Sequence, residues 1–372
     1  MGRRPSVVIA GMVAGQPHQG GAAWAVLQYV LGCRSLGYDV TLVQPVASAT
    51  PDAVGYFRRV VEAFGLDGQA ALVDPAGATA GMTRESLLAR MDRADVLFNI
   101  SGMLRDEEML AAIPRRVLLD LDPAFNQIWH LQGADMGFDR HTHFVTIATQ
   151  IGQPSCTVPE CDVPWITTLQ PIVLDAWPVS NTLTHDALTT VGHWRSYGSV
   201  VHDGVFYGQK AHAWRGLMGI PSVVAKPCMP ALAIHADEIR DLAALDAAGW
   251  QRFDPSQVCD TPATYQAFVA GSWAELGIAK SGYVVSGSGW FSDRSIAYLA
   301  SGRPVIAHDT GFSAVLPIGE GLMAFSTPTD VAEAVDAIAS DYSKHRRRAR
   351  EIAEEFFDAR RVLPLLVDRV LG

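Results

Sequence analysis

Short apolar runs alternate with segments of helical periodicity along almost the whole chain, and this pattern limits the possible folds more than any other feature. In the first half, strands are predicted at residues 6–11, 40–44, 94–100 and 116–121, and helices at residues 20–37 and 51–64. Strands that alternate with helices form βαβ units, in which the strands lie parallel in one sheet. The chain has 372 residues, more than a single hydrophobic core usually supports, so we expect two domains.

A second series of the same kind begins near residue 189. Strands are predicted there at residues 190–192, 222–225, 282–285 and 305–307, and helices at residues 211–218, 239–249, 265–277, 330–342 and 346–357. The sequence therefore predicts an α/β protein with two Rossmann-like, doubly wound domains at residues 1–180 and 181–345. Both sheets would direct the carboxyl ends of their strands into a common cleft, where open α/β sheets bind ligands.

The composition argues against several classes of protein. Hydrophobic residues make up 49% of the chain and charged residues 18%, as in an ordinary globular protein rather than a disordered one. The net charge of -10 makes nucleic acid an unexpected partner, because phosphate backbones attract basic surfaces. Five cysteines without a CxxC pair indicate reduced thiols in a cytoplasmic protein. No apolar run approaches the length of a membrane span, so stable membrane insertion is not expected.

A glycine-rich turn, a short helix and a strand follow one another at residues 286–309. The turn reads Ser-Gly-Ser-Gly-Trp-Phe-Ser, the helix ends at Gly302, and Val305-Ile306-Ala307 is the predicted strand. The first backbone N–H groups of a helix lack partners within the helix, and the helix dipole is positive at that end. The segment therefore predicts a phosphate site at the carboxyl edge of the second sheet.

The same segment resembles a known family. Gly289-Trp290, Ser292 and the run Ala-Ser-Gly-Arg-Pro-Val-Ile at residues 300–306 resemble the donor-binding region of GT-B-fold glycosyltransferases. Residues 300–311 are also similar to the retaining members of that fold that use nucleotide sugars. The resemblance implies that Gly289, Trp290 and Ser292 lie at the pyrophosphate of the donor.

The resemblance also implies which domain binds which substrate. Residues 1–180 would bind the acceptor and residues 181–345 the nucleotide sugar, and a helix within residues 346–372 would return to the first domain. The chain departs from the plant-type motif at Gly287, where relatives have a histidine, and at Ser295, where they have the acidic residue that holds the ribose. We hypothesise that Glu320, in the loop that follows the strand at 305–307, reaches the ribose instead.

Candidate catalytic residues lie in the first half. In inverting relatives a histidine in the loop after the first strand is the catalytic base, and His18 occupies that place. Gly20 and Gly21 could instead face the donor phosphates, as in the retaining relatives. Asp122, in the sequence Asp120-Leu-Asp122, is a candidate to orient His18. The alternatives are a polar loop histidine and a pair of carboxylates that form a turn or helix cap, and a metal site at this pair is not predicted.

Further candidates for donor binding lie in the second half. Retaining relatives place a lysine near Lys210 to neutralise the leaving phosphate, and Arg294 is a weaker candidate for the same role. Asp309-Thr310-Gly311 ends the strand at the position where relatives meet the sugar hydroxyls. Asp309 would equally suit a helix N-cap.

The sequence therefore predicts a glycosyltransferase that uses a UDP- or dTDP-linked sugar as co-substrate, without a further cofactor, and transfers the sugar to a small-molecule acceptor. The arginine-rich, lysine-poor composition suggests a bacterial source, and natural-product or cell-envelope biosynthesis would suit it. The chain could form a homodimer. A nucleotide-sugar epimerase or hydrolase of the same fold and a non-catalytic nucleotide-sugar-binding protein remain as alternatives.

Overall fold

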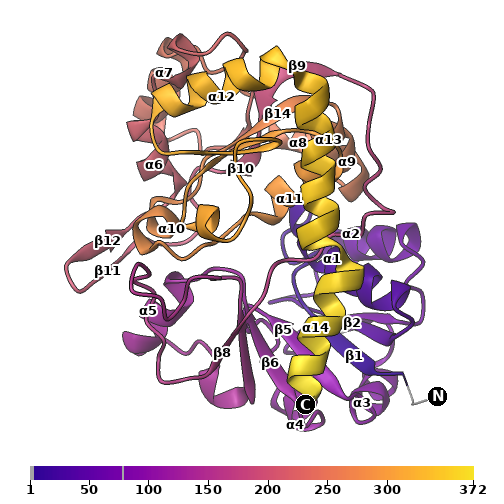
Figure 1. Cartoon of the computed structure of the whole chain (residues 1–372). Helices are drawn as coiled ribbons and strands as arrows, with labels where there is room; N and C mark the ends of the chain where they lie inside the picture. The colour runs from indigo at the N-terminus through magenta and orange to yellow at the C-terminus, as the bar shows by residue number, and fades with distance from the viewer. Residues whose placement is uncertain (1–3, 78) are drawn as a thin grey trace.

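Two separate sheets organise the part of the chain that the computed structural model describes, residues 4–77 and 79–372 (Figure 1). The first sheet has the strand order β4-β3-β2-β1-β5-β6-β7-β8, with β4 antiparallel to β3. Its strands are β1 (Ser6–Ala10), β2 (Asp39–Pro45), β3 (Ala70–Val73), β4 (Thr79–Gly81), β5 (Val96–Ile100), β6 (Arg116–Asp120), β7 (His143–Thr146) and β8 (Trp165–Thr167). The strand order reverses at β1, which pairs with β2 on one side and β5 on the other, and such a reversal opens a crevice at the carboxyl edge.

The second sheet lies above the first in Figure 1 and has the order β16-β15-β14-β9, with parallel pairing. After Thr190 the chain continues from β9 into β10, which pairs in parallel with β13, while β11 and β12 form a hairpin. These strands are β9 (His185–Thr189), β10 (Val191–His193), β11 (Val200–His202), β12 (Val205–Tyr207), β13 (Ala231–Ala233), β14 (Ser272–Gly277), β15 (Val305–His308) and β16 (Leu322–Phe325).

Three predictions of secondary structure in the second half are wrong. The predicted helix at 265–277 is helix α9 (Pro262–Ala270) followed by β14, whose six residues are all buried as in a central parallel strand. The predicted strand at 282–285 is the short helix α10 (Ser281–Ser286), which ends at Gly287 in the left-handed conformation. The strand predicted at 222–225 lies at 231–233 instead, and the predicted segment holds the end of a 3₁₀ helix (Ile220–Ser222) followed by irregular chain.

Several helices begin at a Thr-Pro pair, and these pairs fix the helix starts. Thr50, Thr261 and Thr327 each accept a hydrogen bond from the backbone N–H three residues on, and the proline that follows needs no partner for its nitrogen. The helices besides α9 and α10 are α1 (Gly20–Ser35), α2 (Pro51–Ala63), α3 (Arg84–Met91), α4 (Glu107–Ala111), α5 (Phe125–Leu131), α6 (Lys210–Gly216), α7 (Ile239–Ala247), α8 (Pro255–Val258), α11 (Asp293–Ala300), α12 (Pro328–Ser340), α13 (Tyr342–Ile352) and α14 (Ala359–Leu371).

The C-terminal helices connect the two halves. A π-helical turn (Ala353–Phe357) joins α13, which packs beside α11, to α14, which packs against α1 of the first half (Figure 1). Gly32 of α1 faces α14 closely: a Cβ there would lie 2.5 Å from Leu363 Cδ1 and 2.9 Å from Ala359 Cβ. The absence of a side chain at Gly32 therefore lets the returning helix approach α1.

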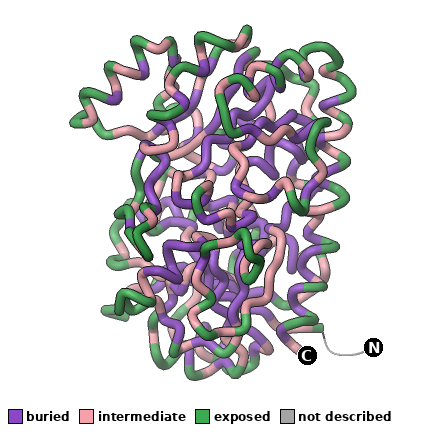
Figure 2. The backbone as a smooth tube through the Cα atoms, turned by 60° about the vertical axis from the view of Figure 1, so that its left-hand side comes forward, coloured by how far each residue is buried: buried purple, intermediate pink, exposed green. Residues whose placement is uncertain are grey.

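The largest hydrophobic cluster extends through both halves, and buried backbone runs through the waist between the sheets in Figure 2. Trp177, fully buried in the loop that leads to the second half, packs against Trp24 of α1 at 5.0 Å and against Tyr265 of α9 at 6.2 Å between ring centroids. The two sheets are therefore held by a shared core. Among the described helices, none is long and apolar enough to cross a membrane.

The close contact at Gly32 predicts a position-specific effect of added side chains. Gly32→Val should lower the free energy of unfolding by about 1–3 kcal/mol, because the valine overpacks the contact between α1 and α14. Gly55→Ala is the matched control in α2, where a Cβ meets an arginine side chain at 3.6 Å and alanine should be neutral or stabilising. Equal effects of the two substitutions in denaturant titrations would contradict the packing described here.

Candidate functional site

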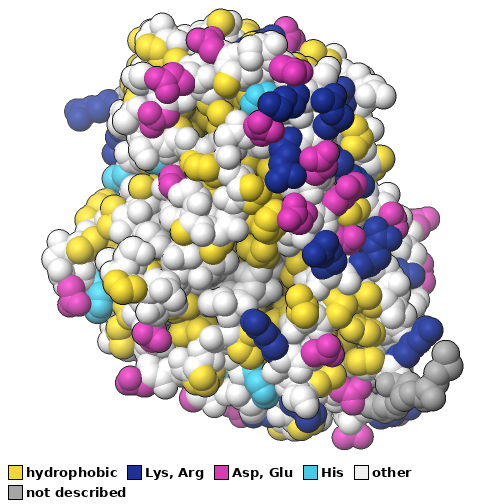
Figure 3. Space-filling view, viewed as in Figure 1, with side chains coloured by type: hydrophobic (Ala, Val, Ile, Leu, Met, Phe, Trp, Pro, Cys, Tyr) yellow, Lys and Arg dark blue, Asp and Glu magenta, His cyan; other side chains and the backbone are white. Residues whose placement is uncertain are grey.

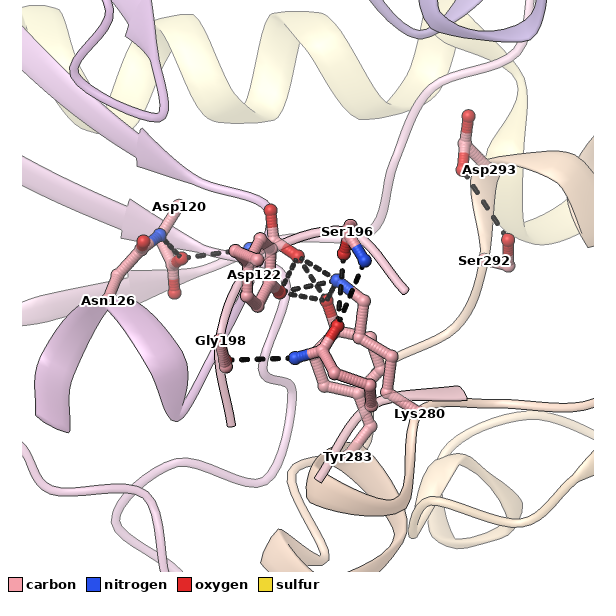
Figure 4. A network of polar contacts seen from close by, with 11 residues as sticks. Asp120, Asp122, Asn126, Ser196, Gly198, Lys280, Tyr283, Ser292 and Asp293 are labelled. Carbon is pink, nitrogen blue, oxygen red and sulfur yellow. Dashed lines mark hydrogen bonds and ion pairs between the residues drawn. The ribbon is translucent and has the colours of Figure 1, made fainter. Parts of the chain in front are cut away.

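A small pocket lies at the N-terminus of α11, where the carboxyl ends of β14 and β15 meet. It is lined by Gly277, Ala279, Trp290, Phe291, Ser292, Arg294, Ser295, Ala307, His308 and Phe312. Ser292 is the N-cap residue of α11, and Asp293 follows it in the first turn (Figure 4). Burial raises the pKa of Asp293, which favours the uncharged carboxyl. The pocket therefore lies at a positive helix end, and the acidic residue in the first turn of that helix favours its uncharged form.

Two side chains that the sequence offers as candidates for donor binding lie near each other here. Arg294 lines the pocket, and Lys210 lies near Arg294, because the consecutive residues Val191 and Gly192 contact the two side chains. Arg294 donates to the Glu275 carboxylate (Nε–Oε1, 2.5 Å) and to the Val191 carbonyl (2.9 Å). Lys210, the first residue of α6, is 9% exposed, and its Nζ has no hydrogen-bond or ion-pair partner among residues 4–77 and 79–372. Burial lowers the pKa of Lys210 well below its ordinary value, and the positive charge of Arg294 lowers it further. A largely buried lysine whose amino group has no partner in the described residues is a candidate for binding an anion.

A third cation, Lys280, was missed in the sequence. It lies just after β14 and its Nζ donates to Asp122 Oδ1 across the gap between the two halves, at 3.0 Å (Figure 4). Asp122 also accepts from Tyr197 (2.5 Å) and Tyr283, and the Lys280 ammonium lies 3.9 Å from the centre of the Tyr197 ring. Burial alone would raise the pKa of Asp122, but Lys280 and the two hydroxyls together lower it, so Asp122 is ionised. The role of Lys280 is not visible in the sequence, because the fold alone brings its partners Asp122 and Tyr197 together beside it.

Asp120 has a structural role beside Asp122. Its buried carboxylate accepts from Asn126 (2.6 Å), Gln127 (2.8 Å) and Thr146 (2.8 Å), and Oδ1 also accepts from the backbone N–H of Asp122 (3.0 Å). These bonds fix the turn that aims Asp122 at the second half (Figure 4). Within the described ranges, no group of three or more His, Cys, Asp or Glu side chains could hold a metal ion.

The glycine turn before α11 contacts the first half instead of lying open to the pocket. The Gly289 N–H donates to Thr310 O at 2.7 Å, and its carbonyl accepts from Thr149 Oγ1 at 3.1 Å. Gly289 has φ +74°, and a Cβ there would clash with Thr149 and Gln150. Trp290 stacks on Tyr283 at 4.3 Å between centroids. The glycine is therefore required by the contact between the halves, and its N–H is already used.

The loop after β15 supports this turn. Asp309 accepts from the Gly311 N–H at 2.9 Å and from Ser313 Oγ at 2.6 Å, while the Thr310 hydroxyl donates to the Trp290 carbonyl. Gly311 has φ +93°, and a Cβ there would lie 2.9 Å from the Gly287 carbonyl oxygen. Asp309 thus stabilises the turn that leads into the 3₁₀ helix Phe312–Ala314, but it is not the helix N-cap that the sequence offered as the alternative to sugar binding, because Gly311 occupies the N-cap position.

The loop before α1 does not bring His18 to Asp122. His18 has φ +67°, and its ring nitrogens pair with Asp260 Oδ1 (Nδ1, 2.6 Å) and Asp52 Oδ1 (Nε2, 3.2 Å). Asp52 belongs to α2 and Asp260 to the segment before α9, so the imidazole bridges the two halves. Because carboxylates accept on both sides, the doubly protonated ring is favoured.

The neighbouring glycines allow the same approach. The Gly20 N–H donates to the Cys259 carbonyl at 2.9 Å, and a Cβ at Gly20 would clash with the Thr261 carbonyl. A Cβ at Gly21 would lie 2.8 Å from the ring of Tyr265. In this structure, both glycines therefore face the segment around α9 of the second half, and the Gly20 N–H is not free for a phosphate.

The structure places Glu320 away from the pocket, which corrects the ribose hypothesis. Glu320 precedes β16, at the amino edge of the second sheet, whereas the pocket lies at the carboxyl edge. Its carboxylate pairs with Lys344 of α13 at 2.8 Å. Lys and Arg side chains gather over α13 on the face shown in Figure 3, among acidic side chains. Sequence proximity to β15 was misleading, because a β-strand connection returns to the opposite edge before the next parallel strand begins.

Solved structures similar to this protein cover the whole chain. An alpha-glucosyltransferase in complex with UDP-glucose and DNA containing an abasic site has 11% sequence identity and a TM-score of 0.65, over 99% of each chain. HepE from Anabaena in complex with UDP and glucose has 9% identity and a TM-score of 0.60, also over 99% of each chain. No protein-family model and no curated protein sequence matches this chain. The predicted GT-B fold, with its two Rossmann-like domains and returning helix, is confirmed.

The His18 bridge predicts a pH-dependent stability. The hydrogen bond to Asp52 raises the pKa of His18 above 6.5, and Asp260 adds to this effect. A raised pKa stabilises the folded state below the unfolded pKa, and this gain is lost as the pH rises through the folded pKa. The melting temperature of the native protein should exceed that of His18→Gln at about pH 5.5, and this difference in melting temperature should shrink toward about pH 8.5. A difference that is constant over this range would contradict the bridge.

Proposed function

We propose that this protein is a glycosyltransferase that moves a sugar from a UDP- or dTDP-linked donor to a small-molecule acceptor. One observation carries the proposal: Arg294 lines the pocket at the positive end of α11, and the largely buried Lys210 lies near it, because the consecutive residues Val191 and Gly192 contact the two side chains. A diphosphate has the charge and the oxygen acceptors that such a site needs. The proposal is supported by the similar GT-B structures, whose descriptions name UDP or UDP-glucose.

The proposed division of labour follows the two sheets. Residues 181–345 would hold the donor and residues 1–180 the acceptor, with residues 346–372 tying the halves together. When the bond between the sugar and the diphosphate breaks, negative charge grows on the departing phosphate. Lys210, Arg294 and the α11 N-terminus are placed to stabilise that charge, and stabilisation of this kind is a large part of enzymatic rate enhancement.

Asp122 is the proposed base for the acceptor hydroxyl. In the structure its carboxylate is neutralised by Lys280, which keeps its pKa low and makes it a weak base. A bound diphosphate would attract the Lys280 ammonium, and Asp122 would then recover basicity beside the reacting centre. His18, bonded to Asp52 and Asp260, would have to leave one of them before it could accept a proton. The geometry therefore favours Asp122 as the base and His18 as an interdomain bridge.

The acceptor is proposed to be a small molecule of bacterial natural-product or cell-envelope biosynthesis. One similar structure contains DNA, but the net charge of -10 on this chain opposes binding to a phosphate backbone. Only four of its 29 basic residues are lysines, as expected of a bacterial chain encoded by a GC-rich genome.

A panel of UDP- and dTDP-sugars tests the proposal. Thermal shift reports binding, and nucleotide release with and without candidate acceptors reports transfer. We expect one nucleotide to stabilise the protein. We also expect the protein to hydrolyse the sugar conjugate of that nucleotide slowly when no acceptor is present. Isomerisation of the sugar without nucleotide release would favour an epimerase, and stabilisation without turnover by any acceptor would favour a binding protein. Absence of stabilisation by every nucleotide would contradict the proposal.

Lys210 predicts opposite effects on stability and binding. Lys210→Met should raise the melting temperature, because a largely buried lysine without a partner in the described residues is replaced by an apolar chain of similar length. The same change should weaken UDP binding by roughly ten- to a hundredfold, the usual cost of losing a hydrogen bond to a charged group. The control is Lys344→Met at the opposite edge of the sheet, where calorimetry should show native affinity. Native affinity in Lys210→Met would contradict the assignment of this cation to the donor.

A further inference from the structure

A carboxylate that sequence analysis did not single out lies against the cations of the proposed donor site. Glu275, in the middle of β14, is 0% exposed. Its Oε1 accepts from Arg294 Nε at 2.5 Å and from Thr190 Oγ1 at 3.4 Å. Its Oε2 has no partner within the part of the chain that the structure describes. Burying a carboxylate completely destabilises a fold unless the charge is paired or serves a function, so a role for Glu275 is expected.

Three consecutive residues at the junction of β9 and β10 contact three charged groups. Thr190 donates to Glu275, the Val191 carbonyl accepts from Arg294 Nη1 at 2.9 Å, and Gly192 faces Lys210. A Cβ at Gly192 would lie 2.7 Å from Lys210 Nζ, so the missing side chain makes room for the ammonium. The carboxylate and the two cations therefore form one buried cluster around a single strand junction.

The cluster adjoins the pocket through Gly277. Residues 275 and 277 lie on the same side of β14, because side chains alternate along a strand. A Cβ at Gly277 would lie 3.3 Å from Glu275 Oε1, and Gly277 itself lines the pocket. The charge of Glu275 is therefore exerted close to the place where an anion would bind, without a side chain in between.

We propose that Glu275 is a positioning residue of the donor site. It holds the Arg294 guanidinium at the first turn of α11, and its negative charge keeps Arg294 and Lys210 together until the diphosphate binds. The inference rests on the proposed function, since it takes the bound anion to be a nucleoside diphosphate. Two cations near each other in a buried setting repel each other, and the Glu275 carboxylate, bonded to Arg294, offsets that repulsion. The cluster keeps a surplus positive charge for the donor.

The charge of Glu275 affects how many protons Lys210 takes up when a diphosphate binds. Burial and the charge of Arg294 both lower the pKa of Lys210, and Glu275 acts in the opposite direction. Removing the Glu275 charge would lower the pKa of Lys210 further, so a larger fraction of Lys210 would have to gain a proton when the diphosphate binds. Binding would then weaken as the pH rises, by up to about tenfold per pH unit. A purely structural glutamate would not produce this pH dependence.

The test is calorimetric titration of UDP into the native protein and into Glu275→Gln between about pH 7.5 and 9.0, where the diphosphate is fully ionised. Measurements in two buffers of different ionisation enthalpy give the protons taken up per UDP. We expect Glu275→Gln to take up more protons and to lose affinity more steeply with pH than the native protein. Native affinity, slope and proton uptake in this variant would overturn the proposal.

Two further variants make the result specific. Asp241→Asn removes another buried carboxylate of the same domain, bonded to Arg215 at 2.7 Å, and should leave the pH slope unchanged. Glu275→Asp keeps the charge but shortens its reach, so the slope should be native while affinity falls because Arg294 is displaced. If Glu275→Gln does not fold, native affinity in Glu275→Asp overturns the proposal. If the native protein binds neither UDP nor dTDP, the proposed function fails instead, and the two failures are distinguished.

Discussion

The two halves of this protein share a hydrophobic core and also approach each other closely at several glycines, and the site depends on that close approach. Gly20 and Gly21 of the first half lie against the segment around α9, and Gly289 of the second half lies against Thr149 and Gln150. Any larger residue at these positions would hold the carboxyl edges apart. The close approach lets Asp122 reach Lys280 across the gap, and both side chains are largely withdrawn from solvent. Charges that would be weak in solvent become strong there.

Burial of charged side chains destabilises the second half, where Lys210, Arg294 and Glu275 are buried together. A chain selected for stability alone would replace an unpartnered ammonium with an apolar residue. Retention of the ammonium is understandable if a ligand supplies the missing negative charge. Lys210, the α11 N-terminus and the Arg294–Glu275 pair then act as one preorganised anion site, which needs little rearrangement when charge develops on a departing phosphate.

The sequence was sufficient for the architecture and for part of the site. Alternating apolar and helical segments predicted two mainly parallel sheets, and the turn before α11 led to the place where the pocket lies; the donor-binding roles of Lys210 and Arg294 stay predictions. Local patterns failed where a short apolar run suits either a helix or a strand, as at 265–277 and 282–285. They also failed where function depends on contacts between distant segments. Glu275 looks like an ordinary residue of a strand, Lys280 meets Asp122 only across the domains, and Glu320 lies on the wrong edge of its sheet.

The central claim is that a nucleoside diphosphate binds at the N-terminus of α11 between the two halves. A crystal structure of the protein with UDP bound tests it most directly. The account predicts that the phosphate oxygens contact Lys210 Nζ, the Arg294 guanidinium and backbone N–H groups of the first turn of α11, with Glu275 still bonded to Arg294. A nucleotide bound elsewhere, with Lys210 left unpartnered in the complex, would contradict the account.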